Sequence, residues 1–298
     1  MSLTKEQISS WFRELQLHIC NELEAEDGLA KFEEDTWERP GGGGGHTRVI
    51  QHGKVFEKGG VNFSAVHGNL TENITKALGV NSSEFYATGV SIVIHPINPF
   101  VPIIHMNVRY FELSDGTYWF GGGIDLTPHY IQKEDAKHFH LCLKQACDGF
   151  NNHAYSDYKK WADDYFFIKH RKETRGIGGI FFDRLKETDE QSKADIWNFV
   201  QRVGETFAPT YRKMVADNKQ KAYDASNLQW RNLRRGRYVE FNLVYDKGTK
   251  FGLETDGRIE SILMSLPENA SWFYNFQPES NSPEAETLSL LKKGVDWV

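Results

Sequence analysis

Between residues 47 and 121 the sequence contains five short extended stretches, and no long helical stretch separates them. They are rich in Val, Ile, Phe and Tyr, and several alternate apolar and polar residues with the period of a strand. The stretches are Thr47–Gln51, Val61–Val66, Phe85–Ile94, Ile103–Leu113 and Thr117–Gly121. Since strands in close succession pair antiparallel, this region predicts a broad antiparallel sheet.

Helical spacing of apolar residues flanks this region on both sides. We expect a first helix over Lys5–Leu23, with Thr4 as its N-cap. Further helices are expected over about Glu134–Gly149, Ser156–Lys169, Asp189–Ala216 (interrupted near Pro209) and Pro283–Lys293, and a strand over Tyr238–Tyr245. With neither repeats nor a clear linker, the sequence predicts one α+β domain over residues 1–298, a sheet covered by helices.

Composition excludes several function classes. The 298 residues are 39% hydrophobic and 13% aromatic, which is typical of a fully globular chain. A net charge of -6 argues against general affinity for nucleic acid or anionic membranes. No run of about 18 apolar residues predicts a membrane span, and no signal or transit peptide is recognisable, so we expect a cytoplasmic protein. The three cysteines lack Cys-x-x-Cys spacing, which excludes a thiolate zinc site.

Polar side chains gather on one side of two expected strands. Ser91 and His95 share one side of the first, and His105, Asn107 and Arg109 share one side of the second. The other side of the second strand carries Met106, Val108 and Tyr110. Each polar residue alone is more often a satisfied structural group, but two matching rows favour a binding surface.

Glycines precede a second candidate residue, Asp125. In Trp119-Phe-Gly-Gly-Gly-Ile-Asp-Leu-Thr-Pro128, three glycines would let the backbone approach a flat ligand and would deliver Asp125 at the end of an aromatic strand. The alternative is a bulge with Asp125 capping a turn. The five glycines Gly41–Gly45 lack the Gly-Lys-Ser/Thr of a phosphate loop, so we expect a mobile loop, with a lid as the functional alternative.

Basic residues form two further clusters. Lys169–Arg175 runs directly into a glycine-rich apolar stretch, which suggests that cations and backbone frame a pocket. The run Arg231–Arg237 could be a nucleic-acid patch, a minority interpretation given the overall acidity. His138 and His140 diverge on a helix and cannot chelate together. Whether His95, His105, His140 and His170 meet in space stays open.

These same segments resemble the oxygen-dependent coproporphyrinogen III oxidases. The resemblance runs from about Gly41 to Pro267. It is carried by GGGGGHTRV, GVNFSAVHG, IHPxNPxVP with HMNVR, WFGGGxDLTP, YKKWxDDYF with KHR, RGIGGIFFD, and YVEFNLVYDxGTxFGL with RxESILMSLP. The N-terminal helix and the tail after Trp272 are less distinctive.

The resemblance implies a flat antiparallel sheet between helices, a homodimer, and oxidation of two propionates of coproporphyrinogen III to vinyls with O2 as acceptor. It requires no organic cofactor, and some family members are described as metal-dependent whereas others are metal-free. We expect the metal-free reaction. Position by position, the resemblance places a general acid/base at His105, the pyrrole-binding acid at Asp125, and substrate contacts at Ser91, Asn107, Val108, Arg109, Arg175, Asp256, Gly257 and Arg258. The ligands of a metal would fall on His95, His105, His140 and His170.

The hypothesis that follows is simple in outline. Arginines bind substrate carboxylates bidentately, and Asp125 anchors and activates a pyrrole. Oxygen adds to the electron-rich pyrrole, His105 or the resulting peroxide takes a β-hydrogen, and the carboxylate leaves as carbon dioxide. The rivals are a metal-dependent oxygenase and a nucleic-acid-binding protein.

Overall fold

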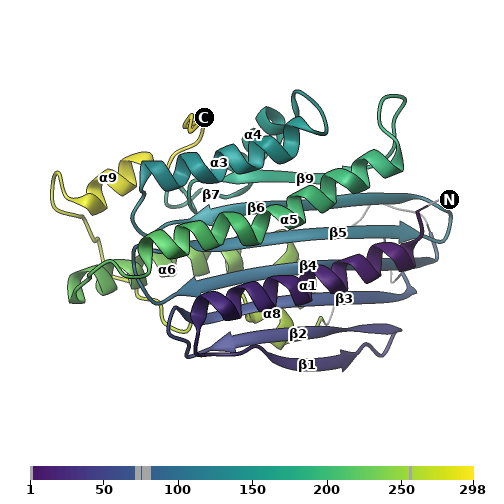
Figure 1. Ribbon diagram of the computed structural model, residues 1–298, viewed down its shortest axis with the longest axis horizontal. Helices are drawn as coiled ribbons and strands as arrows, with labels where there is room; N and C mark the ends of the chain where they lie inside the picture. The colour runs from purple at the N-terminus through teal and green to yellow at the C-terminus, as the bar shows by residue number, and fades with distance from the viewer. Residues whose placement is uncertain (1–2, 71–74, 76–81, 255–256) are drawn as a thin grey trace.

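The computed structural model describes residues 3–70, 75, 82–254 and 257–298. Its main sheet is built from seven strands, and helices lie on both sides of it (Figure 1). In chain order the elements are α1 Lys5–Asp27, β1 Glu33–Glu38, β2 Gly43–Gln51, β3 Phe56–Asn69, β4 Glu84–Pro96, β5 Ile103–Leu113, β6 Tyr118–Thr127, α3 Lys133–Asp148, α4 Ala154–Tyr165, β7 Phe167–Ile168, β8 Glu173–Thr174, β9 Gly179–Leu185, α5 Lys193–Asn218, α6 Ala225–Val244, α7 Lys247–Glu254, α8 Ile259–Leu263 and α9 Pro283–Leu290.

The sheet has the order β1-β2-β3-β4-β5-β6-β9, and every neighbouring pair is antiparallel. Strands β1 to β6 follow chain order, so each pairs with the strand just before it. Strand β9 joins beside β6 after α3 and α4. The expected α+β class, with a broad antiparallel sheet between helices, is therefore confirmed.

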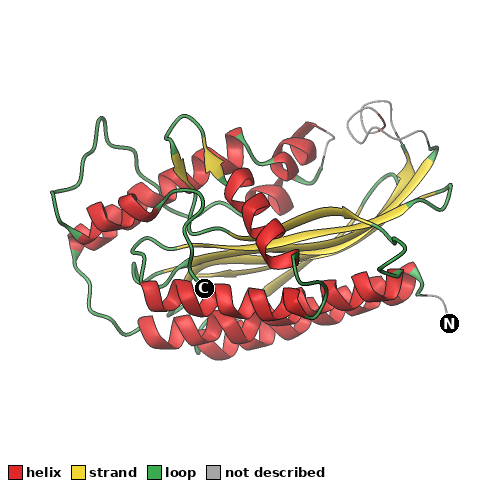
Figure 2. Ribbon diagram, turned by 90° about the horizontal axis from the view of Figure 1, so that it is seen from above, coloured by secondary structure: helices red, strands yellow, loops and turns green. Residues whose placement is uncertain are grey.

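One face of the sheet, here called the apolar face, is packed against α1, α3 and α5. Figure 2 shows these helices as a layer beneath the sheet. On β5 this face presents Met106, Val108 and Tyr110, each at most 1% exposed and part of one continuous core with residues of α1 and α5. Burying an apolar side chain of this size contributes about 1.5–3 kcal/mol, so this face carries much of the stability.

Helix α1 is fixed at both ends. Thr4 and Gln7 form a reciprocal capping box at its start, as the sequence predicts, and Gly28 ends the helix in a left-handed conformation. The helix runs four residues beyond the expected Leu23, to Asp27. The Asp27 carboxylate accepts hydrogen bonds from backbone N–H groups of Ala30 and of Lys54 to Phe56, which ties the helix end to the β2–β3 hairpin.

The opposite face, here called the polar face, is covered only in part, by α6, α7 and α8. The Asn62 side chain on β3 donates to the Ser261 carbonyl of α8 at 2.8 Å, and Thr47 on β2 bonds the Ser261 hydroxyl at 2.8 Å. Met264 lies against Gly60, where a Cβ atom would come within 2.0 Å of its sulfur. A side chain at this position would therefore displace Met264, which follows α8.

The expected strand over Tyr238–Tyr245 is wrong, because these residues belong to α6. Burial along this segment follows a helical period, with Trp230, Leu233 and then Tyr238 and Phe241 turned inward. Charged residues interrupt the apolar pattern, because Arg234 and Arg235 are buried as well. Their polarity hides the helical period from a reading of apolar residues alone.

Three smaller expectations also change. Helix α5 continues through Pro209 without interruption, because buried residues on both sides of the proline, such as Phe207 and Tyr211, hold it against the sheet. The glycine run is not a loop throughout, since Gly43–Gly45 begin β2 and pair with β3. Strand β6 extends to Thr127, so Asp125 lies within the strand and does not cap a turn.

The arginine run of α6 is internal, which contradicts the nucleic-acid interpretation. Arg231, Arg234, Arg235 and Arg237 are 0–8% exposed. They form ion pairs with Glu57, Glu173 and Glu240. A nucleic acid could not reach these guanidinium groups. In the described part of the chain, each helix is too short or too polar to cross a membrane.

Candidate active site

A row of small and polar residues crosses the polar face from strand to strand. The register places Thr47, Asn62, Ser91 and Asn107 side by side on β2 to β5, and Gly123 follows on β6. Beside it, a second row contains Gly45, Ser64, Gly89, Arg109 and Gly121. Thr47 and Asn62 are covered by Ser261 of α8. The rest of the two rows carries few side chains and forms a flat floor of backbone and hydrogen-bonding groups.

Gly123 of β6 is required for this floor, and the neighbouring Gly121 leaves room for two charged side chains. A Cβ atom on Gly121 would lie 2.5 Å from the Asp183 carboxylate and 2.8 Å from the Arg109 guanidinium. One on Gly123 would lie 2.8 Å from the Ile180 carbonyl oxygen. A bulge, which the sequence offered only as the alternative to a binding role, is present as a register shift between Phe120 and Gly122 in the pairing with β9, and the extra residue lies on β9.

At one end of the floor, His105, Asp125 and Arg175 form a connected group. His105 and Asp125 are directly opposite on β5 and β6, and the histidine Nδ1 lies 2.7 Å from Asp125 Oδ1. Arg175, from the segment before β9, donates to both carboxylate oxygens at 2.7 Å. The acid and the arginine are 1% and 2% exposed, whereas the histidine side chain is 22% exposed. Only the histidine of this group can therefore meet a ligand directly.

The electrostatics keep Asp125 ionised. Burial alone would raise the pKa of this carboxyl, but the adjacent Arg175 charge and the hydrogen bond from His105 together hold the pKa below its usual value. An ionised carboxylate can only accept hydrogen bonds, so His105 carries its proton on Nδ1. The other ring nitrogen, Nε2, then has a free lone pair and can accept a proton.

Arg175 is held by rings and by one amide. Its guanidinium lies 4.4–4.7 Å from the ring centres of Phe166, Tyr238 and Phe241, and it donates to the Asn242 side chain at 2.8 Å. Cation–π contacts of this kind favour a desolvated guanidinium. Arg175 therefore acts on Asp125, and its side chain does not reach the floor.

The arginines that do border the floor are Arg109 and Arg258. Arg109 donates to Asn107 at 2.7 Å and to Asp183 at 2.8 Å, and its side chain is 35% exposed. Arg258 donates to Ser261 at 3.1 Å and pairs with Asp35. The strands beneath these two arginines, β2 and β5, are three strand spacings apart, or about 14 Å.

The remaining predicted contacts differ in what they present. Ser91 is partly exposed on the floor next to Asn107, as expected. Val108 points its side chain into the core of the apolar face, so only its main chain borders the floor. Gly257 follows α7 and approaches the Gly252 carbonyl, while Asp256 lies outside the described residues.

The comparisons with known proteins give the family of the chain. The family profile described as coproporphyrinogen III oxidase matches residues 7–297. The chain belongs to the coproporphyrinogen III oxidase family. A rat mitochondrial oxygen-dependent coproporphyrinogen-III oxidase is 51% identical over 99% of this chain and 69% of its own length. The Drosophila melanogaster protein of that name is 51% identical over 96% and 76%, and the Prochlorococcus marinus protein 45% identical over 95% and 88%.

The four histidines that the family resemblance suggests as metal ligands each have another partner. His95 bonds the Ser265 carbonyl oxygen at 2.8 Å, and His140 bonds that of Ile177 at 3.0 Å. His170 pairs with Glu240 at 2.6 Å, and His105 with Asp125. Within residues 3–70, 75, 82–254 and 257–298, no group of three or more His, Cys, Asp or Glu side chains is placed to hold a metal.

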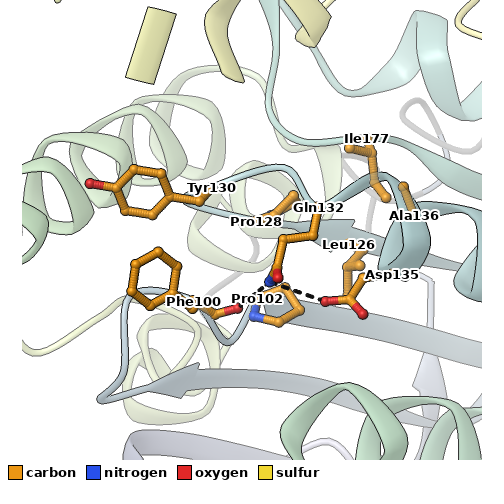
Figure 3. A pocket seen from close by; sticks show the side chains of 9 residues that line it. All are labelled: Phe100, Pro102, Leu126, Pro128, Tyr130, Gln132, Asp135, Ala136 and Ile177. Atoms are coloured by element: carbon orange, nitrogen blue, oxygen red, sulfur yellow. Dashed lines mark hydrogen bonds between the residues drawn. The ribbon is translucent and has the colours of Figure 1, made fainter. Parts of the chain in front are cut away.

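An enclosed cavity between the end of β6 and the start of α3 is separate from this family site. Figure 3 shows its lining, which includes Phe100, Pro128, Tyr130 and Gln132. Its volume of about 10 Å³ is enough for about one water molecule. The Gln132 amide already donates to the Phe100 carbonyl and to Asp135. A tetrapyrrole cannot enter a cavity of this size.

Sequence reasoning gave no role to several residues of this site. In the sequence Asp183 is only the last residue of the segment RGIGGIFFD. Its pairing with Arg109 depends on the bulge between β6 and β9, which the sequence does not show. Tyr238, Phe241 and Asn242 were assigned to a strand, which hid their approach to Arg175. A search for a 3.6-residue period that counts the arginines as buried positions would have predicted a helix here.

Proposed function

We infer that the chain is an oxygen-dependent coproporphyrinogen III oxidase, and we propose which residues carry each part of the reaction. The family reaction acts on two propionates of the substrate and yields protoporphyrinogen IX, a precursor of haem. For each propionate, a C–H bond and the C–C bond to the carboxylate break, which leaves a vinyl group and carbon dioxide. The two electrons released reduce O2 to hydrogen peroxide, with the C–H proton and one further proton.

The single observation that carries this proposal is a flat polar floor that ends at a charge-supported histidine. A tetrapyrrole is broad and carries several carboxylates around its rim. The floor offers backbone and small side chains over the area where the ring would lie, and the border supplies Arg109 and Arg258. Guanidinium groups suit carboxylates because they bind them with two parallel hydrogen bonds. Ser91 and Asn107 add hydrogen bonds from below.

His105 is the proposed base. Asp125 fixes its tautomer and orientation, and the negative charge of Asp125 stabilises the imidazolium that forms when Nε2 takes the proton. A triad of Asp, His and a reacting group works by the same division of labour. Both Asp125 oxygens are already hydrogen-bonded to protein side chains. We therefore propose that Asp125 acts on the substrate through His105, and that the direct pyrrole contact is secondary.

Oxygen is the proposed electron acceptor, since the rat and Drosophila relatives are named oxygen-dependent. We propose that neither an organic cofactor nor a metal is needed, because the electron-rich pyrrole can itself react with oxygen. The homodimer and the cytoplasmic location stay predictions, since the relatives include proteins named mitochondrial and chloroplastic.

The test is turnover of coproporphyrinogen III by the purified chain under air and under nitrogen. Protoporphyrinogen should form only under air, together with hydrogen peroxide. His105→Gln should lower kcat by a factor on the order of 10²–10⁴, the usual contribution of a general base. His18→Gln, on the exposed side of α1, is the matched control. Turnover under nitrogen, or equal turnover in both variants, would contradict the proposal.

A further inference from the structure

Beyond Arg109, the polar face ends in a ladder of three aromatic rings with an arginine at each end. Phe85 on β4 stacks on Phe111 of β5 with ring centres 5.6 Å apart, and Phe111 stacks on Trp119 of β6 at 4.5 Å. The Arg39 guanidinium lies 5.5 Å from the ring centre of Phe85, and that of Arg184 lies 5.2 Å from Trp119.

The ladder continues the floor without a gap. Trp119 and Phe111 are directly opposite, two residues along their strands from Gly121 and Arg109, and side chains two residues apart share a face. From Asp125 to Trp119 is six residues along one strand, a distance on the order of 20 Å. The floor therefore lies between the acid at one end and the rings at the other.

The position of Arg184 depends on the bulge between β6 and β9. Phe182 pairs with Gly122 and Leu185 with Phe120, so two residues of β9, Asp183 and Arg184, lie opposite the single Gly121. Arg184 takes a left-handed conformation, with φ of 54°, which costs a residue with a side chain about 1 kcal/mol or more. Regular alternation would turn it to the apolar face, and the bulge instead places it on the Trp119 ring.

We propose that the ladder is the far end of the substrate site, a proposal that rests on the function inferred above. In it, the ring edges of Phe111 and Trp119, whose faces are already stacked, pack against the apolar rim of the tetrapyrrole that lies farthest from Asp125. Arg184 and Arg39 bind the propionates of that rim. The propionate that reacts then lies at the end of the floor that carries Asp125. The other propionates are bound at the ladder, and their positions determine which propionate reaches Asp125.

Cross-strand aromatic pairs also stabilise sheets, by roughly 0.2–1 kcal/mol each. That role alone would explain Phe85, Phe111 and Trp119. It explains neither the strained backbone of Arg184 nor the arginine on each outer ring, both on the face that carries His105. A role in stability and a role in binding predict different measurements for the same substitutions.

The experiment uses four variants of the full chain. Trp119→Leu removes the ring, and Trp119→Phe keeps a ring in its place. Arg184→Asn removes the charge while suiting the left-handed backbone, which Asn tolerates. Arg212→Gln, a surface arginine of α5 outside the polar face, is the control. Each is measured by thermal melting, by steady-state kinetics with coproporphyrinogen III, and by equilibrium binding of coproporphyrin III, the stable oxidised form.

We expect Trp119→Leu to raise KM by about two- to tenfold, the worth of one aromatic stacking contact. Arg184→Asn should raise KM about two- to fivefold, because a partly solvated charge pair is weaker than a buried one. The dissociation constant of coproporphyrin should rise in parallel. The kcat should stay within about twofold of the parent chain, and both Trp119→Phe and the Arg212 control should keep the parent KM.

A lower melting temperature with unchanged KM and unchanged coproporphyrin binding in both test variants would overturn the proposal and leave the ladder a structural element. A fall in kcat without a change in KM would overturn it as well. Neither result touches the proposed function, whose failure would instead appear as absent oxygen-dependent turnover in the parent chain.

Discussion

The two faces of strand β5 are built from alternate residues of one segment, yet one face stabilises the fold and the other borders the candidate site. Met106, Val108 and Tyr110 are packed into the core against helices, whereas His105, Asn107 and Arg109 border an accessible floor. The first set forms no polar site, and the second contributes little apolar burial. In this sheet, stability and chemistry are separated by the direction of the side chain rather than by position along the chain.

The largest expected effect of the polar face is in Asp125→Asn. Turnover should fall by a factor on the order of 10²–10⁴, because the histidine loses its charged support. Stability should fall as well, since Arg175 then keeps an uncompensated buried charge, which costs about 3–5 kcal/mol. Steady-state kinetics and thermal melting measure the two effects separately.

A second variant separates chemistry from folding at this site. Asp125→Asn combined with Arg175→Gln removes both buried charges, so the melting temperature should recover in part while turnover stays low. If turnover recovered together with stability, or if Asp125→Asn alone kept more than about a tenth of the parent rate, the proposed role of Asp125 would fail.

The next effect concerns the border of the floor. Arg109→Ala and Arg258→Ala should each weaken substrate affinity by about ten- to a hundredfold, the worth of a charged hydrogen bond. Met106→Ala, on the same strand as Arg109, should instead cost about 2–5 kcal/mol of stability and leave KM near the parent value. Affinity that is unchanged in both arginine variants would mean that the floor does not bind the substrate.

A smaller effect separates the buried His140 from the exposed His18, both on helices over the apolar face. Burial lowers the pKa of His140, on α3 over the apolar face, to about 3, against an ordinary value near 6.5. Its contribution to stability is therefore complete above about pH 6.5 and is lost as the pH falls toward 3. Melting temperatures from pH 7 to 4 should fall more steeply in the parent chain than in His140→Gln. His18→Gln should follow the parent, and equal slopes in all three would contradict the expectation.

The last prediction is that removal of metal ions has no effect on turnover. Exhaustive chelation followed by metal analysis should leave the turnover of the purified chain unchanged, because the four candidate histidines are each bonded to other groups. A loss of activity that added Mn or Fe restores would favour the metal-dependent rival instead.

Local patterns were enough to predict the sheet and much of the floor. The period of two in Ile103–Leu113 separates Met106 and Val108 from His105 and Asn107, and the structure has the same separation over the same bounds. The glycines before Asp125 indicated that the backbone could approach a flat ligand, which stays a prediction, and in the structure the Ile180 carbonyl lies 2.8 Å from where a Cβ atom of Gly123 would be. Such features depend on neighbours in the chain, and a sequence displays them directly.

What the sequence could not display are the contacts between distant segments. Arg175 was expected to face the substrate, but Asp125, 50 residues earlier, holds it inside. Aromatic and β-branched residues around Tyr238–Tyr245 favoured a strand. In the structure Tyr238 and Phe241 lie on one side of helix α6 and pack against Arg175. Pro209 was expected to interrupt α5, but the helix continues. Its buried residues pack against the sheet, and this contact between distant segments is also invisible in the sequence.

The order of the strands has a consequence for how the protein is made. Strands β1 to β6 can pair as each is synthesised, whereas β9 reaches β6 only after the intervening helices have emerged. Arg175 lies in the segment that leads into β9, so Asp125 is without its buried counter-charge until that segment docks. Completion of the sheet edge and completion of the acid–base group are thus one event. A nascent chain that ends before Arg175 lacks both.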